Sequence, residues 1–423
     1  VVQEVNALGG VTRRDYDLNN NMTLEVDALV NTNRFTYDAD GNVLTRTDPL
    51  GNVTLNSYSR IVPRGWFNFT GRTITLLATT TDPLGNTTQN TYDTAGNLTA
   101  TTDARGNVTR YEYDGAGNQT KITDAAGNVT QFAYDGAGRL TQQTDALGTA
   151  TTFTYDANGN QLTQATTLTT PSGPKLLVTT TTYDANGRPT SVTDAAGNVT
   201  RTEYDALGKT RATIDGLGHR TEFRYDERGQ LVRTVFADET FSELAYDAAG
   251  RRTASTDRAG RTTHYLHDAL GRLVATAYPD GTPDDLADNP RTLTYYDLTG
   301  RVIAQTDEAG HSTWFGYDAA GRQTSITNAL GHITRSEYDT AGRKIADLDA
   351  LGRRTRFEYD ALGRLVKTIF ADNTTKQTSY DALGRVTSET DQAGVKTEFE
   401  YDALGRLTAV VDALGGRTEY GYN

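Results

Sequence analysis

Short segments rich in β-branched and aromatic residues alternate with glycine-containing polar segments along the whole chain. Each segment between glycines holds about six residues rich in Thr, Val, Tyr, Phe and Leu, which is the composition and length of a β-strand. A glycine or another helix breaker recurs every ten or eleven residues, which leaves no room for a stable helix. The pattern predicts an all-β chain of short strands joined by turns.

Two related motifs supply these turns. The first turn reads Y-D-x-x-G-R/N, as at 359–364, and the second turn reads D-A-x-G-N-x-T, as at 194–200. In both motifs an Asp precedes a Gly by three residues. The Asp side chain accepts hydrogen bonds from nearby backbone N–H groups, and Gly adopts a positive φ without strain. Each pair of motifs therefore predicts one two-stranded hairpin, and their succession predicts a continuous antiparallel meander.

The Tyr-Asp pair sets the period of this meander. With Tyr16 and three degenerate positions included (Tyr58, His267 and Tyr422), it occurs 19 times, and 15 of the 18 intervals are 21 residues long. The other intervals, of 34, 28 and 29 residues, predict insertions near 60–72, 166–177 and 279–290 in a single array over 1–423. The residues predicted to maintain the repeat are Tyr37, Asp38, Gly41, Tyr113, Asp114, Gly117, Tyr134, Asp135, Gly138, Tyr204, Asp205, Gly208, Tyr317, Asp318, Gly321, Tyr359, Asp360, Gly363, Tyr401, Asp402 and Gly405.

The odd period carries a constraint, because strand side chains alternate between faces with period two. Each unit must therefore absorb one step. We expect a three-residue loop with a glycine bulge at the first turn and a turn of opposite parity at the second. The variant second turns at 236–240 and 370–374 fit a tighter reversal. Each Tyr would then lie opposite the residue six positions later, as Tyr134 opposite Leu140 and Tyr359 opposite Leu365.

The number of strands predicts the overall shape. Roughly 38 strands spaced ~4.8 Å apart form a ribbon ~180 Å wide. Open sheets twist and rarely exceed about ten strands without curling. Closed in one turn, this ribbon would be almost 60 Å across (~180 Å of circumference), and the low aliphatic content cannot fill such an interior. We therefore expect the sheet to curl into a hollow spiral or barrel-like shell.

Charge and composition exclude several kinds of partner. The net charge of −13 disfavours nucleic acids and anionic membranes, which require a basic face. The chain has no Cys, and hence no disulfide, no thiolate nucleophile and no Cys-based zinc site. No apolar stretch approaches the ~18 residues of a membrane-spanning helix. Because the chain begins with Val1 and its only Met is Met22, we expect the natural N-terminus to lie upstream.

The strings Y-D-x-x-G-R-L and T-D-A-x-G-N-x-T closely resemble the repeats of the YD-repeat (Rhs) family, from Asn6 to Tyr422. Members include bacterial polymorphic toxins, B/C components of insecticidal toxin complexes, wall-associated proteins and animal teneurins. The resemblance implies a spiralling β-sheet shell, which in toxin members encloses a C-terminal effector, and a secreted or cell-surface location. Both ends of the chain fall inside a repeat, so we expect a fragment or the ordered part of a larger protein.

Two strings depart from this pattern. Toxin-bearing members of the family end their repeats with D-P-x-G motifs, whose aspartates carry out self-cleavage. Here Asp48-Pro49-Leu50-Gly51 and Asp82-Pro83-Leu84-Gly85 lie early in the chain, in the ordinary position of a second turn. Proline at the second position of a turn is common. We therefore interpret both strings as turns and assign no toxic activity to this chain.

Other polar residues give no convincing site. Equivalent Asp residues of neighbouring units lie two strands apart, roughly 9–10 Å, whereas calcium ligands lie within ~2.5 Å of the ion. Turn capping is therefore the favoured interpretation, and an acidic loop containing Asp280, Asp284, Asp285 and Asp288 is a slightly better calcium candidate. His219, His311 and His332 share one position in the unit and are expected to be exposed turn residues, while His264 and His267 are expected to be structural. No Ser or Thr has a recognisable His–Asp partner pair. We predict no enzyme, no cofactor and no metal site.

Aromatic residues leave two alternatives open. The tyrosine series could present a surface for sugars or peptides, although packing is the favoured interpretation. The insertion that carries Trp66, Phe67 and Phe69 either plugs the shell or forms a contact surface, and plugging is favoured.

Two functional hypotheses follow. The first is a non-catalytic shell of a bacterial toxin-type protein, which encapsulates or presents a polypeptide cargo or the remaining parts of the same protein. The second is a secreted or cell-surface adhesive protein, in which the repeats form a rigid spacer or contact glycans.

Overall fold

The computed structural model describes residues 1–62, 73–170, 173–280 and 288–422. Within these residues there is no helix, and 38 strands form one sheet, as predicted. The strands of the first half are β1 (Val2–Val5), β2 (Val11–Tyr16), β3 (Met22–Val26), β4 (Thr32–Tyr37), β5 (Val43–Thr47), β6 (Val53–Ile61), β7 (Ile74–Thr81), β8 (Thr87–Tyr92), β9 (Leu98–Thr102), β10 (Val108–Tyr113), β11 (Gln119–Thr123), β12 (Val129–Tyr134), β13 (Leu140–Thr144), β14 (Ala150–Tyr155), β15 (Gln161–Thr170), β16 (Gly173–Tyr183), β17 (Pro189–Thr193), β18 (Val199–Tyr204) and β19 (Thr210–Ile214). Those of the second half are β20 (Arg220–Tyr225), β21 (Leu231–Val235), β22 (Phe241–Tyr246), β23 (Arg252–Thr256), β24 (Thr262–His267), β25 (Leu273–Ala277), β26 (Arg291–Tyr296), β27 (Val302–Thr306), β28 (Ser312–Tyr317), β29 (Gln323–Thr327), β30 (Ile333–Tyr338), β31 (Lys344–Leu348), β32 (Arg354–Tyr359), β33 (Leu365–Ile369), β34 (Thr375–Tyr380), β35 (Val386–Thr390), β36 (Lys396–Tyr401), β37 (Leu407–Val411) and β38 (Arg417–Glu419).

The sheet is a simple meander. Each strand pairs antiparallel with the strands before and after it in the sequence, from β1 with β2 to β37 with β38. The hairpins β6–β7 and β15–β16 are longer than the others. Strands β6 and β7 flank the insertion predicted near 60–72, whereas the one predicted near 166–177 lengthens β15 and β16, in which Thr166 pairs with Leu177 and Thr170 with Gly173.

The two turns of a unit have the same backbone geometry. In the first turn, Asp114 N donates to Asn118 O (2.9 Å) and Gly117 N donates to Asp114 O (3.1 Å). In the second turn, both corresponding bonds of Asp124 and Gly127 are 3.0 Å. The expectation of turns of opposite parity was therefore wrong. The variant turn at 236–240 is not tighter either, because Glu239 takes the place of the glycine with a φ of 66° and preserves both hydrogen bonds.

A bulge between the strands absorbs the odd step instead. Tyr113 pairs with Gln119, but its neighbour Glu112 pairs with Lys121, so Thr120 has no partner. The same shift precedes the other repeat tyrosines, such as Tyr134 and Tyr359. The predicted pairs Tyr134–Leu140 and Tyr359–Leu365 are confirmed. One bulge per unit keeps every repeat tyrosine on the same face of the sheet.

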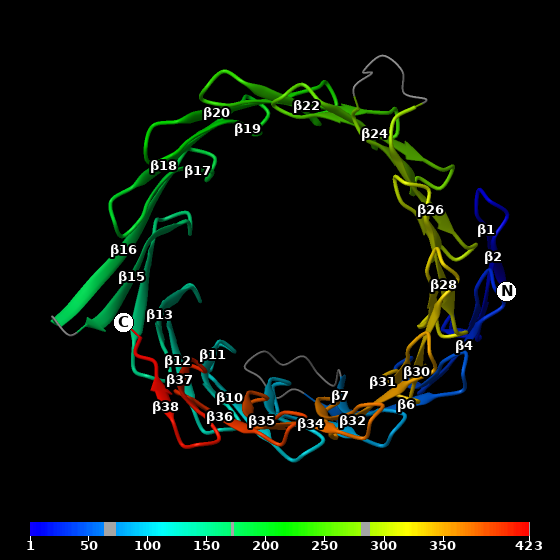
Figure 1. Cartoon of the computed structure of the whole chain (residues 1–423). Coiled ribbons are helices and arrows are strands. Elements are labelled where there is room, and N and C mark those ends of the chain that lie inside the picture. The colour runs from blue at the N-terminus through cyan, green and yellow to red at the C-terminus, as the bar shows by residue number, and fades with distance from the viewer. Residues whose placement is uncertain (63–72, 171–172, 281–287, 423) are drawn as a thin grey trace.

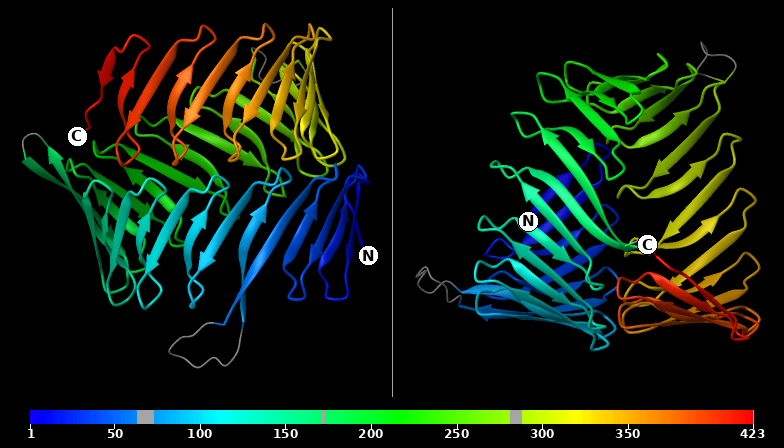
Figure 2. Two further views of the ribbon diagram at one scale, coloured as in Figure 1. Left: turned by 90° about the horizontal axis from the view of Figure 1, so that it is seen from below. Right: turned by 90° about the vertical axis from the view of Figure 1, so that its left-hand side faces the viewer.

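The sheet curls into a hollow spiral that does not close on itself, which confirms the predicted architecture (Figure 1). The chain makes more than one turn, so that the C-terminal coil lies on the N-terminal coil (Figure 2). Asn6, between β1 and β2, lies 3.5 Å (Nδ2 to O) from Leu298, between β26 and β27. Further along the same joint, Arg105 Nη1 lies 3.1 Å from Asp360 Oδ2. These contacts join the edges of successive coils.

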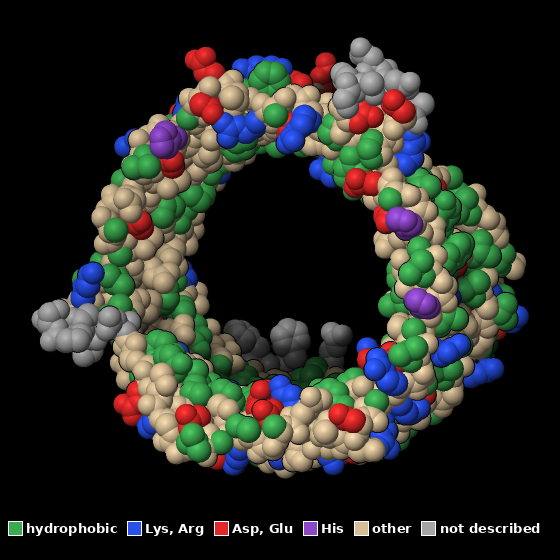
Figure 3. Space-filling view, in the orientation of Figure 1, with side chains coloured by type: hydrophobic (Ala, Val, Ile, Leu, Met, Phe, Trp, Pro, Cys, Tyr) green, Lys and Arg blue, Asp and Glu red, His purple; other side chains and the backbone are tan. Residues whose placement is uncertain are grey.

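The two faces of the wall differ in chemistry. Along β32 the less exposed side chains are Thr355, Phe357 and Tyr359, whereas the alternate charged side chains are exposed. Side chains on the concave face of a curved sheet converge and shield one another, so we assign the aromatic set to the lumen. Figure 3 agrees, because hydrophobic and uncharged side chains form most of the visible inner wall.

The wall has no conventional hydrophobic core. The buried apolar residues of the described chain are five alanines, namely Ala212, Ala277, Ala304, Ala346 and Ala409. The described part of the chain also contains no helix that is long and apolar enough to cross a membrane. Cohesion must therefore come mainly from hydrogen bonds and from contacts between neighbouring hairpins.

The first turn after Tyr113 offers a test of the turn geometry. Gly117 has a φ of 87°, whereas Gly115 at the tip has an ordinary φ, and neither has atoms within 4 Å of an added Cβ. We expect Gly117→Ala to destabilise the surrounding hairpin by about 1–2 kcal/mol and Gly115→Ala to have little effect. Amide hydrogen exchange over 108–123 measures the difference. Equal protection in the two variants would contradict the assigned geometry.

Candidate functional site

The tyrosines join each hairpin to the one before it. Most of the repeat tyrosines donate through Oη to the backbone carbonyl opposite the preceding tyrosine, as Tyr359 does to Lys344 O (2.6 Å) and Tyr401 does to Val386 O (2.9 Å). The other predicted repeat tyrosines that make this bond are Tyr37, Tyr134, Tyr204 and Tyr317. Tyr113 does not make it, although its strand pairing is regular. The tyrosine hydroxyl is thus a lateral link along the wall.

The predicted aspartates cap their own turns. Asp360 Oδ1 accepts from Leu362 N (2.9 Å) and Arg364 N (3.0 Å). The bond to the backbone N–H four residues later recurs at the other predicted positions, Asp38, Asp114, Asp135, Asp205, Asp318 and Asp402. The predicted glycines 41, 117, 138, 208, 321, 363 and 405 all have positive φ. Every predicted Asp–Gly pair therefore closes a turn.

Arginine at the end of the first turn adds a second lateral link. Arg343 donates through Nε to Asp339 Oδ2 (2.7 Å) and through Nη1 to Asp360 O (3.2 Å) of the next turn. Its guanidinium also lies 5.0 Å from the ring centroid of Tyr359. The Nη1 bond to the next turn is made by Arg139, Arg251, Arg272, Arg301, Arg322, Arg343, Arg364 and Arg385. We call this series, with its aspartates and tyrosines, the tyrosine–arginine ladder.

The ladder bears on whether the tyrosines pack within the wall or form an aromatic surface for sugars or peptides. From Tyr155 to Tyr422, nine tyrosine rings have an arginine of the preceding turn 4.5–5.0 Å from the ring centroid. Their hydroxyls are engaged as well. This arrangement supports packing as the role of these tyrosines rather than a free aromatic surface.

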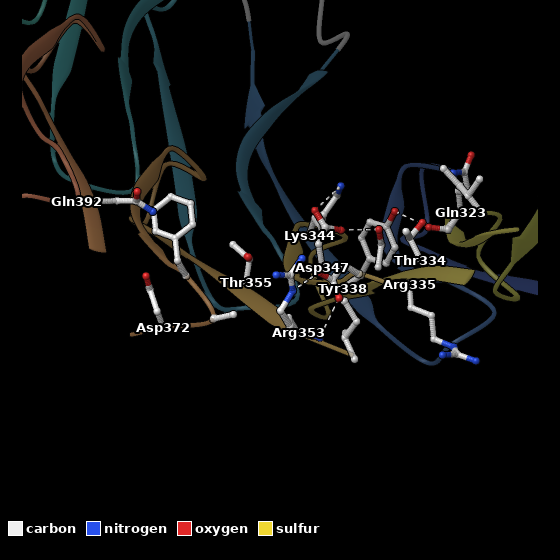
Figure 4. Close-up of a pocket in the computed structure, with 16 residues that line it drawn as sticks. Gln323, Thr334, Arg335, Tyr338, Lys344, Asp347, Arg353, Thr355, Asp372 and Gln392 are labelled. Carbon is white, nitrogen blue, oxygen red and sulfur yellow. Dashed lines mark hydrogen bonds and ion pairs between the residues drawn. The ribbon is translucent and has the colours of Figure 1, made fainter. Parts of the chain in front are cut away.

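A cleft of 850 Å³ lies on the wall between β29 and β35. Figure 4 shows Tyr338, Lys344 and Asp347 on the concave side of the ribbon, and Arg335 on the opposite side. The cleft forms where Ser336 stands at the position that Phe315 and Phe357 occupy in the neighbouring units. Ser336 Oγ donates to Asp347 Oδ1 (2.7 Å), and Lys344 Nζ lies 3.1 Å from Asp347 Oδ2.

This cleft does not resemble a catalytic site. Ser336 donates its proton to a carboxylate that Lys344 already neutralises, and no imidazole lines the cleft to activate the hydroxyl. Its polar groups can hold an extended polypeptide by hydrogen bonds. Sequence reasoning missed this feature, although Ser in place of the aromatic residue two positions before Tyr338 was the available signal.

The two D-P-x-G strings are ordinary second turns. Asp48 Oδ1 accepts from Leu50 N and Asn52 N (both 2.9 Å), and its Oδ2 accepts from Asn52 Nδ2 (2.8 Å). Asp82 makes the same three bonds with Leu84 and Asn86. Both carboxylates are thus engaged as caps, and the interpretation as turns is confirmed.

The histidines take the place of the usual asparagine in second turns. His219 Nδ1 lies 2.9 Å from Asp215 Oδ2, and His311 Nδ1 lies 3.3 Å from Asp307 Oδ2. His332 N donates to Asn328 Oδ1 (3.0 Å), while His264 and His267 lie in β24. Nowhere in the described ranges do three or more His, Asp or Glu side chains converge as metal ligands.

Two predictions concern residues outside the described ranges. One is the plug hypothesis, which concerns Trp66, Phe67 and Phe69. The other is the calcium candidate, of whose four residues Asp284 and Asp285 lie outside the described ranges. They remain predictions.

Arg343 and Arg353 provide a matched test of the ladder. Both contact an Asp four residues earlier, but only Arg343 bonds to the next turn and stacks on a tyrosine. We expect Arg343→Gln to lower the free energy of unfolding by about 1 kcal/mol and Arg353→Gln by less than about 0.5 kcal/mol. Urea denaturation measures both. A larger effect at Arg353 would refute the lateral role.

The turn aspartates predict sensitivity to acid. The side-chain amide of Asn42 lowers the pKa of Asp38, and the backbone N–H of Arg139, followed by its guanidinium, lowers the pKa of Asp135. A carboxyl whose pKa is lower in the folded state stabilises the fold above its unfolded pKa, and this contribution is lost as the pH falls. We expect thermal stability to be constant near neutrality and to decline below about pH 4. A melting temperature that rises below pH 4 would contradict this account.

Comparisons with known proteins identify the family to which a chain with this fold and ladder belongs. The RHS Repeat family model matches residues 75–106, 92–129, 134–175, 162–199, 183–209, 204–240, 246–283, 296–333, 317–346, 338–375, 380–417 and 401–423. A search of curated proteins finds no match.

Solved structures share the fold at low sequence identity. The crystal structure of TcdB2-TccC3 superposes with a TM-score of 0.62 at 16% identity, covering 97% of this chain and 28% of that chain. The Photorhabdus luminescens Tc holotoxin pore with a mutated TccC3 gives a TM-score of 0.57 at 16% identity, covering 95% of this chain and 24% of that chain. This chain thus spans about a quarter of the length of these relatives. The repeat matches and the curled meander together show that the chain belongs to the RHS repeat family.

Proposed function

We propose that this chain is a non-catalytic wall segment of a toxin-type Rhs shell, which surrounds or presents a polypeptide. The observation that carries this proposal is the hollow spiral, a hydrogen-bonded wall whose described residues leave a lumen open at its centre (Figure 1). The resemblance in fold to the TcdB2-TccC3 structure supports the toxin assignment. The cargo would be the remaining part of the same protein or a separate polypeptide, and the location extracellular.

The lumen chemistry suits a polypeptide rather than a charged ligand. Its Thr, Phe and Tyr side chains offer hydrogen bonds and apolar contact without fixed charge, as along β32. Several charges on this face stand in opposite pairs, such as Arg14 with Glu25 (3.0 Å) and Lys344 with Asp347 (3.1 Å), and Arg252 stacks on Tyr265. A lining of this kind holds many sequences weakly and does not select one.

The convex face suits an aqueous exterior. Its charges pair across strands, as Arg354 with Glu337 (2.6 Å) and Arg417 with Glu400 (2.6 Å). Such exposed pairs contribute little to stability but keep a two-sided sheet soluble. The two faces therefore divide the roles of containment and solubility.

The alternative, a straight adhesive or spacer protein that contacts glycans, has less support. A spacer requires an extended rod, whereas these hairpins curl through more than a full turn (Figure 2). The tyrosine rings that would contact sugars are largely covered by arginines.

Neighbouring residues on opposite faces test containment. Thr334 and Arg335 are both exposed in β30, and they project to opposite sides of the wall (Figure 4). Because this chain has no Cys, Thr334→Cys and Arg335→Cys each give it a single labelling site. We expect a small maleimide to label both, and a maleimide on a long polyethylene glycol chain to label Arg335→Cys much faster.

A photo-crosslinker attached at each cysteine identifies the cargo. We expect Thr334→Cys to capture a polypeptide segment that mass spectrometry can assign, and Arg335→Cys to capture none. Equal labelling by the large reagent together with no capture at Thr334 would refute containment.

A further inference from the structure

The joint between the two coils shows what the edge of this wall can bind. Second turns of the N-terminal coil, at 6–10, 27–31, 48–52, 82–86 and 103–107, face first turns of the C-terminal coil, at 297–301, 318–322, 339–343 and 360–364. We call this joint the seam. A cleft of 520 Å³ runs along it, lined by Pro49 and Pro83 from one side and by Ala319, Ala320 and Ala341 from the other. Prolines of the second turns thus meet alanines of the first turns at 318–322 and 339–343.

The exposed fraction of a leucine at the third position of a second turn shows whether another coil covers that edge. At the seam, Leu29, Leu50 and Leu84 are 38%, 44% and 41% exposed. In the same turn position where no coil lies opposite, Leu217, Leu330 and Leu351 are 84%, 81% and 79% exposed, and Leu414 is 98% exposed. Because the turns share one backbone geometry, the opposing coil accounts for the difference.

Two edges of the spiral carry the same chemistry and face no other coil of the described residues. One is the second-turn edge of the C-terminal coil, with Leu351 and Leu414 at its tips. The other is the first-turn edge of the N-terminal coil at 93–97, 114–118 and 135–139, whose small tips Ala95, Ala116 and Ala137 match those of the seam. These edges lie at opposite ends of the spiral over the same arc, as red and cyan strands in Figure 2.

We propose that a second copy of this chain docks head to tail, with the leucine tips of its C-terminal coil seated on the small tips of the N-terminal coil of the first. The contact would repeat the seam between molecules. Such a contact joins unlike surfaces, so each docked copy leaves the same two edges free, and stacks can grow beyond dimers. The proposal does not depend on what the lumen holds.

Disulfide trapping in the cysteine-free chain tests the geometry. We expect a mixture of Leu351→Cys and Ala116→Cys proteins to give at least about ten times more intermolecular disulfide than Leu351→Cys alone, since two leucine edges do not face each other. A mixture of Leu351→Cys with Leu266→Cys is the matched control, because Leu266 is also exposed (52%) but lies in β24 away from the edges. Equal disulfide yields in the two mixtures and in the sample of Leu351→Cys alone would overturn the proposal.

Sedimentation velocity over a concentration series tests the strength of the contact. We expect the double variant Leu351→Ser/Leu414→Ser to associate at least about tenfold more weakly than the unaltered chain, a change of 1.4 kcal/mol in binding free energy. Leu266→Ser should leave association unchanged. A chain that is monomeric at every concentration, or association that survives the double variant and therefore uses the unpaired edges of β1 and β38, would exclude the contact proposed.

Discussion

The structure depends on a single bulge in each 21-residue unit. Because strand side chains alternate with period two, an odd repeat without a bulge would place successive tyrosines on opposite faces. The unpaired residue seven positions after each tyrosine, such as Thr120, removes one step and returns every tyrosine to the concave side. The tyrosine–arginine ladder and the separation of a lumen rich in Thr, Phe and Tyr from a more charged exterior follow from this one irregularity.

Cohesion in this wall is lateral and short-ranged. Each hairpin is bonded to the next through strand pairing, a tyrosine hydroxyl and, from Arg139 onward, mostly an arginine. In repeat proteins of this kind, stability is the sum of the stability of each unit and of its contacts with the adjacent units. A destabilising change in one unit therefore need not unfold distant units. The seam differs, because it joins hairpins that are distant in sequence through few direct polar contacts, among them Asn6 with Leu298 and Arg105 with Asp360. The coils are therefore held to each other less firmly than the hairpins within a coil.

The sequence was sufficient to predict the strands, their number, the hollow spiral and the pairs Tyr134–Leu140 and Tyr359–Leu365. It failed on the turns, because both halves of the unit place Asp and Gly three residues apart and this shared spacing should have indicated identical turns. The odd period indicated that each unit must contain an irregularity, but its position gave no signal, since Thr120, Thr141 and Val366 there are ordinary strand residues. The ladder and the seam were also missed. Arg343 and Tyr359 are 16 residues apart and Arg105 and Asp360 are 255 apart, so only the alignment and curvature of the folded sheet bring them together.

The scarcity of buried apolar surface has a thermodynamic consequence. The heat capacity increase on unfolding comes from newly exposed apolar groups and is reduced by exposed polar groups. The buried apolar side chains of the described wall are five alanines, so we expect a small increase in heat capacity when it unfolds. The enthalpy and entropy of unfolding then vary weakly with temperature, and the stability curve is broad and flat. The free energy of unfolding of such a shell changes little with temperature, whereas that of a protein with a large hydrophobic core changes more.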